Sequence, residues 1–222
     1  MKLKKIASLM LAGAMAVSML AGCEGSANSG ENNGEENQVV AASVADYANS
    51  LLSDKQKNVF KFENSSDLTA ALQKVAGNSK EFTSEEIKKY SDLFAYNQKI
   101  VVDLLAEDLA DEMKLDYNNS STGDQEGLAD TMDKGTKSVG FVYALSGKMA
   151  QDSAVQLIIN YWASTTMDND KFFPATISTH NLNCEYTADI SAVKVTAPDD
   201  SNVSTWVVAI VVTQTATEAA NV

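Results

Sequence analysis

Residues 205–215, with the sequence TWVVAIVVTQT, decide the fold of this chain. Successive side chains of a β-strand point to opposite faces of the sheet, so the stretch presents two sets of residues. Both sets are apolar: Trp206, Val208, Ile210 and Val212 form one, and Val207, Ala209 and Val211 form the other. Left exposed, such a segment would aggregate. We therefore expect a strand that is covered on both faces, with helices supplying at least one of the two covers.

Two further strands are predicted upstream of this one. Residues 180–186 alternate, with His180, Leu182, Cys184 and Tyr186 on one face of the strand. A second strand is expected over 190–197, and the turn-forming sequence PDDSN at 198–202 follows it.

Helical periodicity dominates the earlier part of the chain. Apolar residues recur at helical spacing in 44–52 and in 68–75, and Ser43 is positioned to cap the first of these helices. Thr83 and Glu86 form a capping box, which starts a long helix that we expect to reach about residue 117. The core stripe of this helix contains Ile87, Tyr90, Phe94, Val101 and Leu105.

Two segments allow more than one interpretation. Gly140 and Gly147 weaken a helix over 136–150 and are equally consistent with bends in a strand. Residues 155–163 are apolar nearly all round, which favours a buried helix, with a core strand as the alternative. The state of 136–150 therefore stays open.

The predicted fold class is α+β, with N-terminal helices packed on a small C-terminal antiparallel β-sheet of about three strands. We expect a single domain over 43–222 that is mainly helical in 43–167 and mainly strand in 174–215. Helices and sheet would share one hydrophobic core.

The first 23 residues carry a separate signal. Three lysines within the first five residues precede an apolar run over 6–20, which is too short for a membrane span, and LAGC at 20–23 closes the run. A basic start, a short apolar run and small residues before a cut site are typical of a secretory signal peptide. The cysteine directly after the small residues resembles the lipobox of bacterial lipoproteins.

The resemblance implies a defined processing route. A signal peptide, residues 1–22, would be removed between Gly22 and Cys23, and a diacylglyceryl group would be attached to the Cys23 sulfur. Acyl chains on Cys23 would then hold the protein at the extracytoplasmic face of the cell membrane. The alternative is an ordinary secretory signal in which Cys23 has no role.

Residues 23–42 are expected to form a lipidated cysteine followed by a disordered tether. Within them, EGSANSGENNGEENQ at 24–38 contains no apolar side chain larger than Ala27. Such a stretch cannot bury enough surface to offset the entropy of ordering it. The tether would separate the folded domain from the bilayer.

The charge of the chain argues against nucleic acid as a partner. The sequence contains no arginine, and removal of residues 1–22 leaves 14 lysines against 30 acidic residues. Nucleic-acid binding needs a basic surface, and arginine supplies the planar group that grips phosphate and guanine. An acidic surface also repels anionic lipid headgroups, so the lipid on Cys23 would have to provide the membrane attachment.

Asp108 and Glu112 are the candidate catalytic residues. Both are placed on the apolar side of the predicted long helix, where they continue the stripe beyond Leu105. Carboxylates on an apolar face need a cation or protonation to offset desolvation. A pair about 5–9.5 Å apart beside exposed aromatic side chains would fit glycoside hydrolysis. The alternative is that the helix extends beyond the core after Leu105, so that both carboxylates are solvated.

Two aromatic pairs are the candidate ligand-binding residues, because they flank the junction between the helices and the sheet. The pairs are Tyr161 with Trp162, and Phe172 with Phe173. Exposed aromatic side chains could stack on a sugar ring or anchor a partner. The alternative is that they close the hydrophobic core.

No other residues predict a catalytic, metal or cofactor site. Along a regular strand His180 and Cys184 would lie about 13 Å apart, so we expect a partly buried strand histidine and a small buried thiol. A calcium loop over 116–127 fails at its sixth and twelfth positions, which are Ser121 and Gly127. The chain also lacks glycine-rich nucleotide-binding motifs.

These observations favour a lipid-anchored surface protein that is not an enzyme. Its partners would be the membrane, through the lipid on Cys23, and either a small-molecule ligand or another envelope protein. The competing hypothesis is an extracytoplasmic hydrolase that acts on glycans through Asp108 and Glu112. A third is a structural component of the envelope.

Overall fold

The computed structural model describes residues 43–78, 82–91, 100–118, 134–167 and 172–219. Its α-helices are α1 Val44–Ser50, α2 Asp54–Lys57, α3 Ser66–Asn78, α4 Ser84–Ser91, α5 Ile100–Met113 and α6 Gln151–Trp162. A π-helical turn, Ala163–Met167, follows α6, and a 3₁₀ turn spans Ser178–His180. The strands are β1 Phe62–Asn64, β2 Tyr117–Asn118, β3 Gly135–Ser146, β4 Thr176–Ile177, β5 Leu182–Thr196 and β6 Ser204–Glu218.

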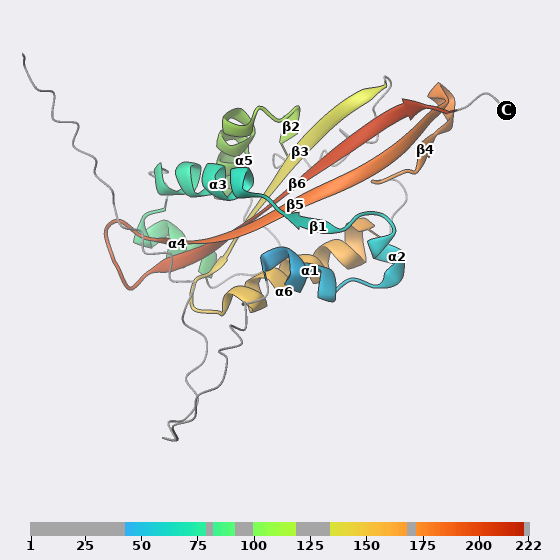
Figure 1. Ribbon diagram of the computed structural model, residues 1–222. Helices are drawn as coiled ribbons and strands as arrows, with labels where there is room; N and C mark the ends of the chain where they lie inside the picture. The colour runs from blue at the N-terminus through green and yellow to red at the C-terminus, as the bar shows by residue number, and fades with distance from the viewer. Residues whose placement is uncertain (1–42, 79–81, 92–99, 119–133, 168–171, 220–222) are drawn as a thin grey trace, which may run out of the picture. The chain divides into compact units, whose positions relative to one another are not determined.

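The described strands form one mixed sheet in the order β1-β5-β6-β3-β2, with β4 also paired to β5 (Figure 1). The long strands β3, β5 and β6 pair antiparallel, and β4 pairs antiparallel with β5. The two short strands pair parallel, β1 with β5 and β2 with β3. The centre of the sheet is therefore β6, the strand that the sequence marked as apolar on both faces.

The prediction of a small antiparallel sheet of about three strands is wrong. The sheet has six described strands, and two of its pairings are parallel. The segment left open at 136–150 supplies β3, which lies within the part predicted to be mainly helical. Strands of three and two residues, β1 and β2, are too short to show an alternating pattern, so tertiary pairing alone defines them.

The two strands predicted over 180–186 and 190–197 are one continuous strand, β5. It pairs with β6 in an unbroken register from Leu182 opposite Glu218 to Thr196 opposite Ser204. Thr187 and Asp189, which lie between the two predicted strands, are on the same face of β5 and are paired with β6 like their neighbours.

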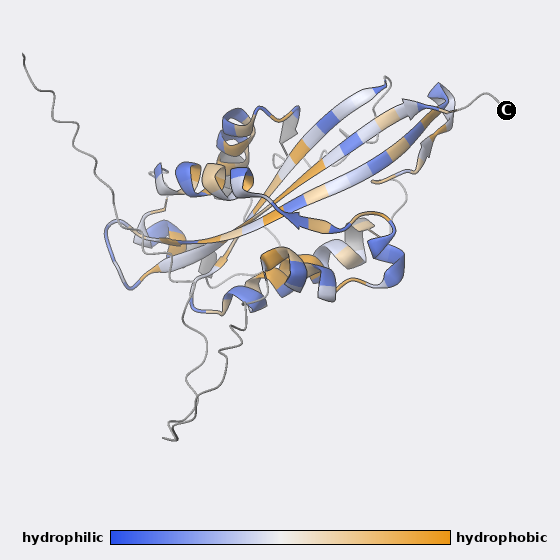
Figure 2. Ribbon diagram, viewed as in Figure 1, coloured by the Kyte–Doolittle hydropathy of each residue, from blue (hydrophilic) through white to orange (hydrophobic). Residues whose placement is uncertain are grey.

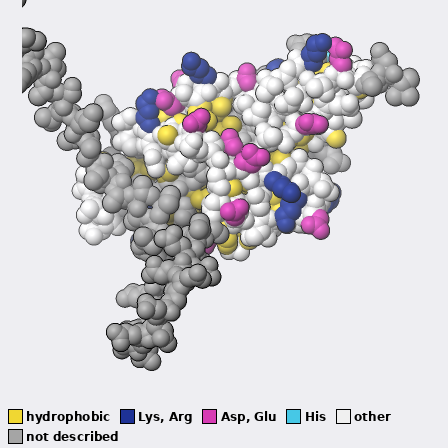
Figure 3. Space-filling model, viewed as in Figure 1, with side chains coloured by type: hydrophobic (Ala, Val, Ile, Leu, Met, Phe, Trp, Pro, Cys, Tyr) yellow, Lys and Arg dark blue, Asp and Glu magenta, His cyan; other side chains and the backbone are white. Residues whose placement is uncertain are grey.

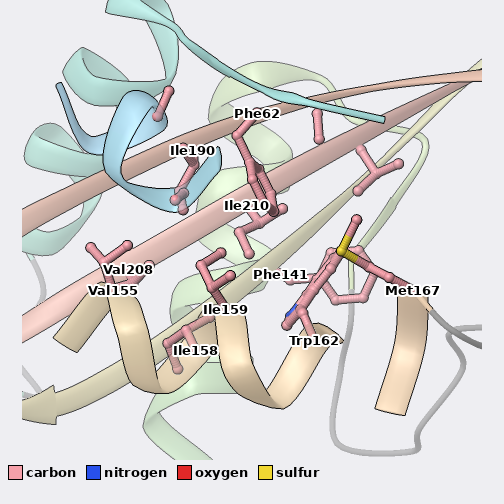
Figure 4. Close-up of a cluster of buried hydrophobic side chains, with 14 of the residues drawn as sticks. Phe62, Phe141, Val155, Ile158, Ile159, Trp162, Met167, Ile190, Val208 and Ile210 are labelled. Carbon is pink, nitrogen blue, oxygen red and sulfur yellow. The ribbon is translucent and has the colours of Figure 1, made fainter. Parts of the chain in front are cut away.

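Helices cover both faces of β6, as its sequence predicts. Val208, Ile210 and Val212 are buried in a cluster with residues of α1 and α6. Val207, Ala209 and Val211 are buried in a second cluster with residues of α3, α4 and α5. Figure 2 shows the hydrophobic residues concentrated in the middle of the long strands. Figure 4 shows how Val155, Ile158, Ile159 and Trp162 of α6 lie against Phe141 and Ile210 of the sheet.

The predicted helix starts are confirmed at two positions. The Ser43 hydroxyl accepts a hydrogen bond from the Asp46 N–H, 3.1 Å, at the start of α1. The Thr83 hydroxyl accepts from the Glu86 N–H, 3.3 Å, immediately before α4. Each hydroxyl satisfies one backbone donor that the first helical turn leaves without a partner.

The long helix predicted from residue 83 is described as α4 and α5, and residues 92–99 lie outside the described residues. Within its predicted core stripe, Ile87 and Leu105 are buried, and the other three side chains are not described. The expected end near residue 117 is wrong, because α5 ends at Met113. Lys114 adopts a left-handed φ of 56°, and the Leu115 N–H bonds the Ala110 carbonyl, 2.9 Å, which closes the helix end.

The buried helix favoured for 155–163 is confirmed, because α6 spans Gln151–Trp162 and buries Val155, Ile158, Ile159 and Trp162. Within the described residues, none of the helices has the length and apolar character needed to cross a bilayer. Residues 1–42 lie outside the described part of the chain, and with them the predicted signal peptide, Gly22, Cys23 and the tether.

Candidate functional site

A hollow of about 750 Å³ lies at the outer edge of β5, and we call it the edge hollow. Three consecutive residues of β5 line it, namely Cys184, Glu185 and Tyr186. Neighbouring side chains of a strand point to opposite faces, so all three can line one space only if that space lies against the strand edge. The other lining residues are Lys55, Asn58, Val59, Met167, Phe173, Pro174, Ala175 and Thr176.

Helix α2 supplies one wall of the edge hollow, and a capping box fixes the start of that helix. The Gln56 N–H donates to the Ser53 hydroxyl, 3.3 Å, and the Ser53 N–H donates to the Gln56 amide oxygen, 2.9 Å. The Gln56 amide nitrogen also donates to the Ala163 carbonyl, 3.2 Å, which ties α2 to the end of α6. Asn58 and Val59, which follow α2 directly, are thereby held beside the sheet edge.

A hydrogen-bonded chain fixes Tyr186 at the edge hollow. The Tyr186 hydroxyl donates to the Pro174 carbonyl, 2.9 Å, and accepts from the Gln214 amide nitrogen, 2.9 Å. Desolvation raises the pKa of Tyr186, so its hydroxyl keeps its proton at neutral pH. Gln214 is 1% exposed, and its amide oxygen has no hydrogen-bond partner in the described part of the chain. Because the single Tyr186 proton goes to Pro174, Gln214 can only donate to Tyr186.

Cys184 is a buried free thiol, as the sequence predicts. Burial raises the pKa of Cys184. The thiolate is the nucleophilic form of cysteine, so a protonated thiol is inert at neutral pH. The geometry therefore gives Cys184 a packing role in the hollow rather than a catalytic one.

His180 lies outside the strand in which the sequence placed it. It belongs to the 3₁₀ turn Ser178–His180, and β5 begins only at Leu182. Asn181 adopts a left-handed φ of 53°, which separates the turn from the strand. His180 is exposed, and its Nδ1 lies 2.8 Å from the Thr179 hydroxyl oxygen. The prediction of a partly buried strand histidine is therefore wrong. The alternating pattern of 182–186 was extended back to His180, but asparagine can adopt the left-handed conformation, and Asn181 ends the strand there.

Of the four candidate ligand-binding aromatics, only Phe173 lines the edge hollow. Trp162 is fully buried against Phe60, Phe141 and Phe173, with ring centroids 6.4, 4.8 and 6.3 Å away. Phe172 packs partly buried against the same cluster. Tyr161 is 45% exposed on the surface of α6. The structure thus assigns these residues mainly to the core.

The candidate carboxylates Asp108 and Glu112 are both exposed on α5. Their placement on the apolar side of the helix is wrong, because the buried face of α5 carries Leu105, Ala106, Leu109 and Ala110. The alternative, in which both carboxylates are solvated, is confirmed, although the helix remains packed on the core beyond Leu105. Glu112 accepts hydrogen bonds from the Lys74 ammonium of α3 at 2.6 and 2.7 Å. A second hollow, of about 380 Å³, is lined by Lys74, Val75, Asn78, Asp108, Asp111 and Glu112. None of its described lining residues is aromatic, so they offer a sugar ring no stacking surface.

The described residues contain no cluster of three or more histidine, cysteine or acidic side chains that could hold a metal ion. The calcium-loop segment 116–127 falls mostly outside the described residues. Its first residue, Asp116, accepts a hydrogen bond from the Ser138 N–H, 2.8 Å, and so caps the start of the β2–β3 pairing. On the face shown in Figure 3, lysines and acidic side chains are interspersed rather than gathered in one patch.

The sequence did not point to Lys55, Asn58, Val59 or Tyr186 as site residues. One local signal was available, since Ser53 and Gln56 have capping-box spacing and predict a short helix at that position. Nothing local relates that helix to a strand more than 100 residues later in the sequence. Comparison of the chain with protein-family models, curated proteins and solved structures found no match.

Proposed function

We propose that this chain is a lipid-anchored extracytoplasmic binding protein and that the edge hollow is its ligand site. The observation that carries the proposal is a space of about 750 Å³ whose lining combines apolar side chains with polar groups, one of which, the Tyr186 hydroxyl, is fixed by two hydrogen bonds. Ligand sites of proteins have this size and this mixture of surfaces. Val59, Met167 and Phe173 provide apolar surface, while Asn58 and Tyr186 provide polar groups.

The chemistry of the hollow supports binding over catalysis. The Cys184 thiol is held protonated, and the Tyr186 hydroxyl is committed to Pro174. A nucleophile needs an adjacent base, and His180 lies in the exposed turn before β5 rather than among the lining residues. The exposed, lysine-paired Glu112 gives no support to the competing hypothesis of a glycan hydrolase.

The proposed anchor rests on the lipobox-like LAGC sequence at 20–23 and on the polar tether that follows it. The substitution Cys23→Ser should release the protein from the membrane and abolish its labelling by an alkyne analogue of palmitate, because serine lacks the sulfur to which the lipid is attached. Cell fractionation and in-gel detection of the label measure both effects. Cys184→Ser, which removes the other cysteine, should leave anchoring and labelling unchanged. Membrane-bound, labelled Cys23→Ser protein would refute the anchor.

The ligand site can be tested with the dye 8-anilinonaphthalene-1-sulfonate, whose fluorescence rises in apolar hollows. The mature protein should bind the dye, and Ala175→Trp should weaken binding about tenfold or more because the indole fills the space beside Phe173. Thr196→Trp is the matched control, since it places the same side chain at the far, exposed end of β5. Circular dichroism checks that both variants fold. Equal dye binding by the Ala175→Trp variant and the original protein would contradict the site.

A further inference from the structure

The backbone groups of β5 alternate between its two neighbours, and four hydrogen bonds fix which residues face which side. Toward β6, the Ala219 N–H donates to the Asn181 carbonyl, 2.8 Å, and the Ala197 N–H donates to the Val203 carbonyl, 2.9 Å. Toward the outer edge, the Cys184 N–H donates to the Ala175 carbonyl, 2.9 Å. The Ala192 carbonyl accepts from the Gln151 side chain, 3.3 Å.

Because the β5–β6 register is unbroken, odd-numbered residues of β5 direct their N–H and C=O groups to β6 and even-numbered residues direct theirs outward. Tyr186 is even-numbered. Its backbone N–H and C=O groups therefore point away from the sheet, toward the side on which the edge hollow lies.

The outer edge of β5 is occupied on both sides of Tyr186 but not at Tyr186 itself. On one side, Ala175 and β4 cover Cys184, Asn183 and Leu182. On the other, β1 pairs with β5 from Ala188 to Ile190. Figure 1 shows β4 and β1 along the same edge. Within the described residues, no backbone group bonds the N–H or C=O of Tyr186. We call the outward N–H and C=O pair of one residue a rung, so Tyr186 is an open rung between two occupied ones.

The open rung coincides with the edge hollow, because Cys184, Glu185 and Tyr186 line that hollow. An unpaired strand edge is a template for another extended backbone. In an antiparallel ladder, a residue that exchanges both hydrogen bonds with Tyr186 has its side chain on the same face as the Tyr186 side chain. On that face the hollow is lined by Phe173, whose ring centroid lies 5.2 Å from that of Tyr186.

We propose that the edge hollow binds a peptide through one extended residue, which pairs antiparallel with the backbone of Tyr186 and places an apolar side chain beside Phe173 and Met167. This inference rests on the proposed function and names its ligand class. Because rungs 184 and 188 are already occupied, the peptide touches the edge at one residue and then turns away, so a short peptide or a chain end fits best.

The test compares two blocked tripeptides, acetyl-Ala-Leu-Ala-amide and the same peptide with N-methyl-leucine at its centre. The methyl group removes the N–H that would donate to the Tyr186 carbonyl and leaves the side chains unchanged. We expect the first peptide to shift the Tyr186 amide resonance of the mature ¹⁵N-labelled protein in detergent micelles. The N-methylated peptide should bind about tenfold more weakly or not at all.

The Lys194 amide is the internal control, because it also faces outward from β5 but does not line the edge hollow. It should show no shift with either peptide. Equal binding of the two peptides, equal shifts at Lys194 and Tyr186, or no binding of either peptide would overturn the inference. If the dye still binds in the hollow in any of these cases, the proposed function stands and only its peptide ligand is refuted.

Discussion

Replacing Trp162 by alanine should lower the free energy of unfolding by about 3–5 kcal/mol, the largest loss we expect from any single side chain in this protein. Trp162 is fully buried at the end of α6 and contacts Phe60, Phe141 and Phe173. Its removal leaves a cavity among aromatic rings that the sheet and α6 hold in place. Urea unfolding followed by circular dichroism measures the change.

The loss also has a polar part, because the Trp162 indole N–H donates to the Tyr143 hydroxyl, 2.7 Å. Tyr143 is half-buried, and the desolvation of its hydroxyl raises the pKa of this group. Trp162→Phe keeps most of the ring but leaves the Tyr143 hydroxyl without this hydrogen bond, at a cost of about 1–3 kcal/mol. Adding Tyr143→Phe removes both polar partners, so the double variant should be more stable than the sum of the two single effects predicts.

The neighbouring residue provides the control for this prediction. Tyr161 is a large aromatic on the same helix but is 45% exposed, so Tyr161→Ala should change the free energy of unfolding by less than about 1 kcal/mol. Comparable losses for Tyr161→Ala and Trp162→Ala would contradict the assignment of Trp162 to the core.

The second large effect is expected at Gly147, which follows β3. A Cβ atom at this position would overlap the backbone carbonyl and the hydroxyl of Ser204, the first residue of β6. The Gly147 N–H donates to the same carbonyl, 3.0 Å, so the two chains are already in close contact. Ser204 is fixed by its pairing with Thr196 and cannot move away cheaply. Gly147→Ala should therefore cost about 1–3 kcal/mol or more of stability.

Gly77→Ala is the matched control for the substitution at Gly147. Gly77 lies in α3, and a Cβ atom there would meet nothing within 4 Å. The same substitution should stabilise the protein there by about 0.5–1 kcal/mol, because alanine favours the helix. The two changes are thus expected to have opposite signs in the same urea experiment. A stabilising or neutral Gly147→Ala would show that the turn after β3 can open away from β6.

Features that depend on a few neighbouring residues could be predicted from the sequence. The caps at Ser43 and Thr83 are confirmed, because a hydroxyl and a backbone N–H three residues later meet within one turn. The burial of α6 followed from the nearly all-round apolar composition of 155–163. The prediction for Asp108 and Glu112 was wrong because it extended the apolar stripe from Leu105 by three and seven residues. The buried face of α5 instead continues through Leu109 and Ala110.

The edge hollow could not be predicted, because its walls come from segments far apart in the chain. Lys55 and Val59 belong to the region of α2, Phe173 and Ala175 precede β4, and Tyr186 lies in β5. Both β1 and β4 pair with the same edge of β5, but β4 ends before it reaches β1. The gap between these two short strands is where the side chains meet. No local pattern in the sequence encodes where two short strands stop along a third.

By itself, the sequence determined that 205–215 is a strand covered on both faces, because strand geometry sends alternate side chains to opposite sides and here all seven side chains from Trp206 to Val212 are apolar. It also determined the acidic charge of the chain and the absence of arginine. The tertiary structure alone decided that 136–146 is a strand, that β1 and β2 pair parallel, and that Tyr186 is left with an open backbone rung. The physical reason is that hydrogen bonds between distant segments select among local conformations of similar energy, which short-range preferences cannot distinguish.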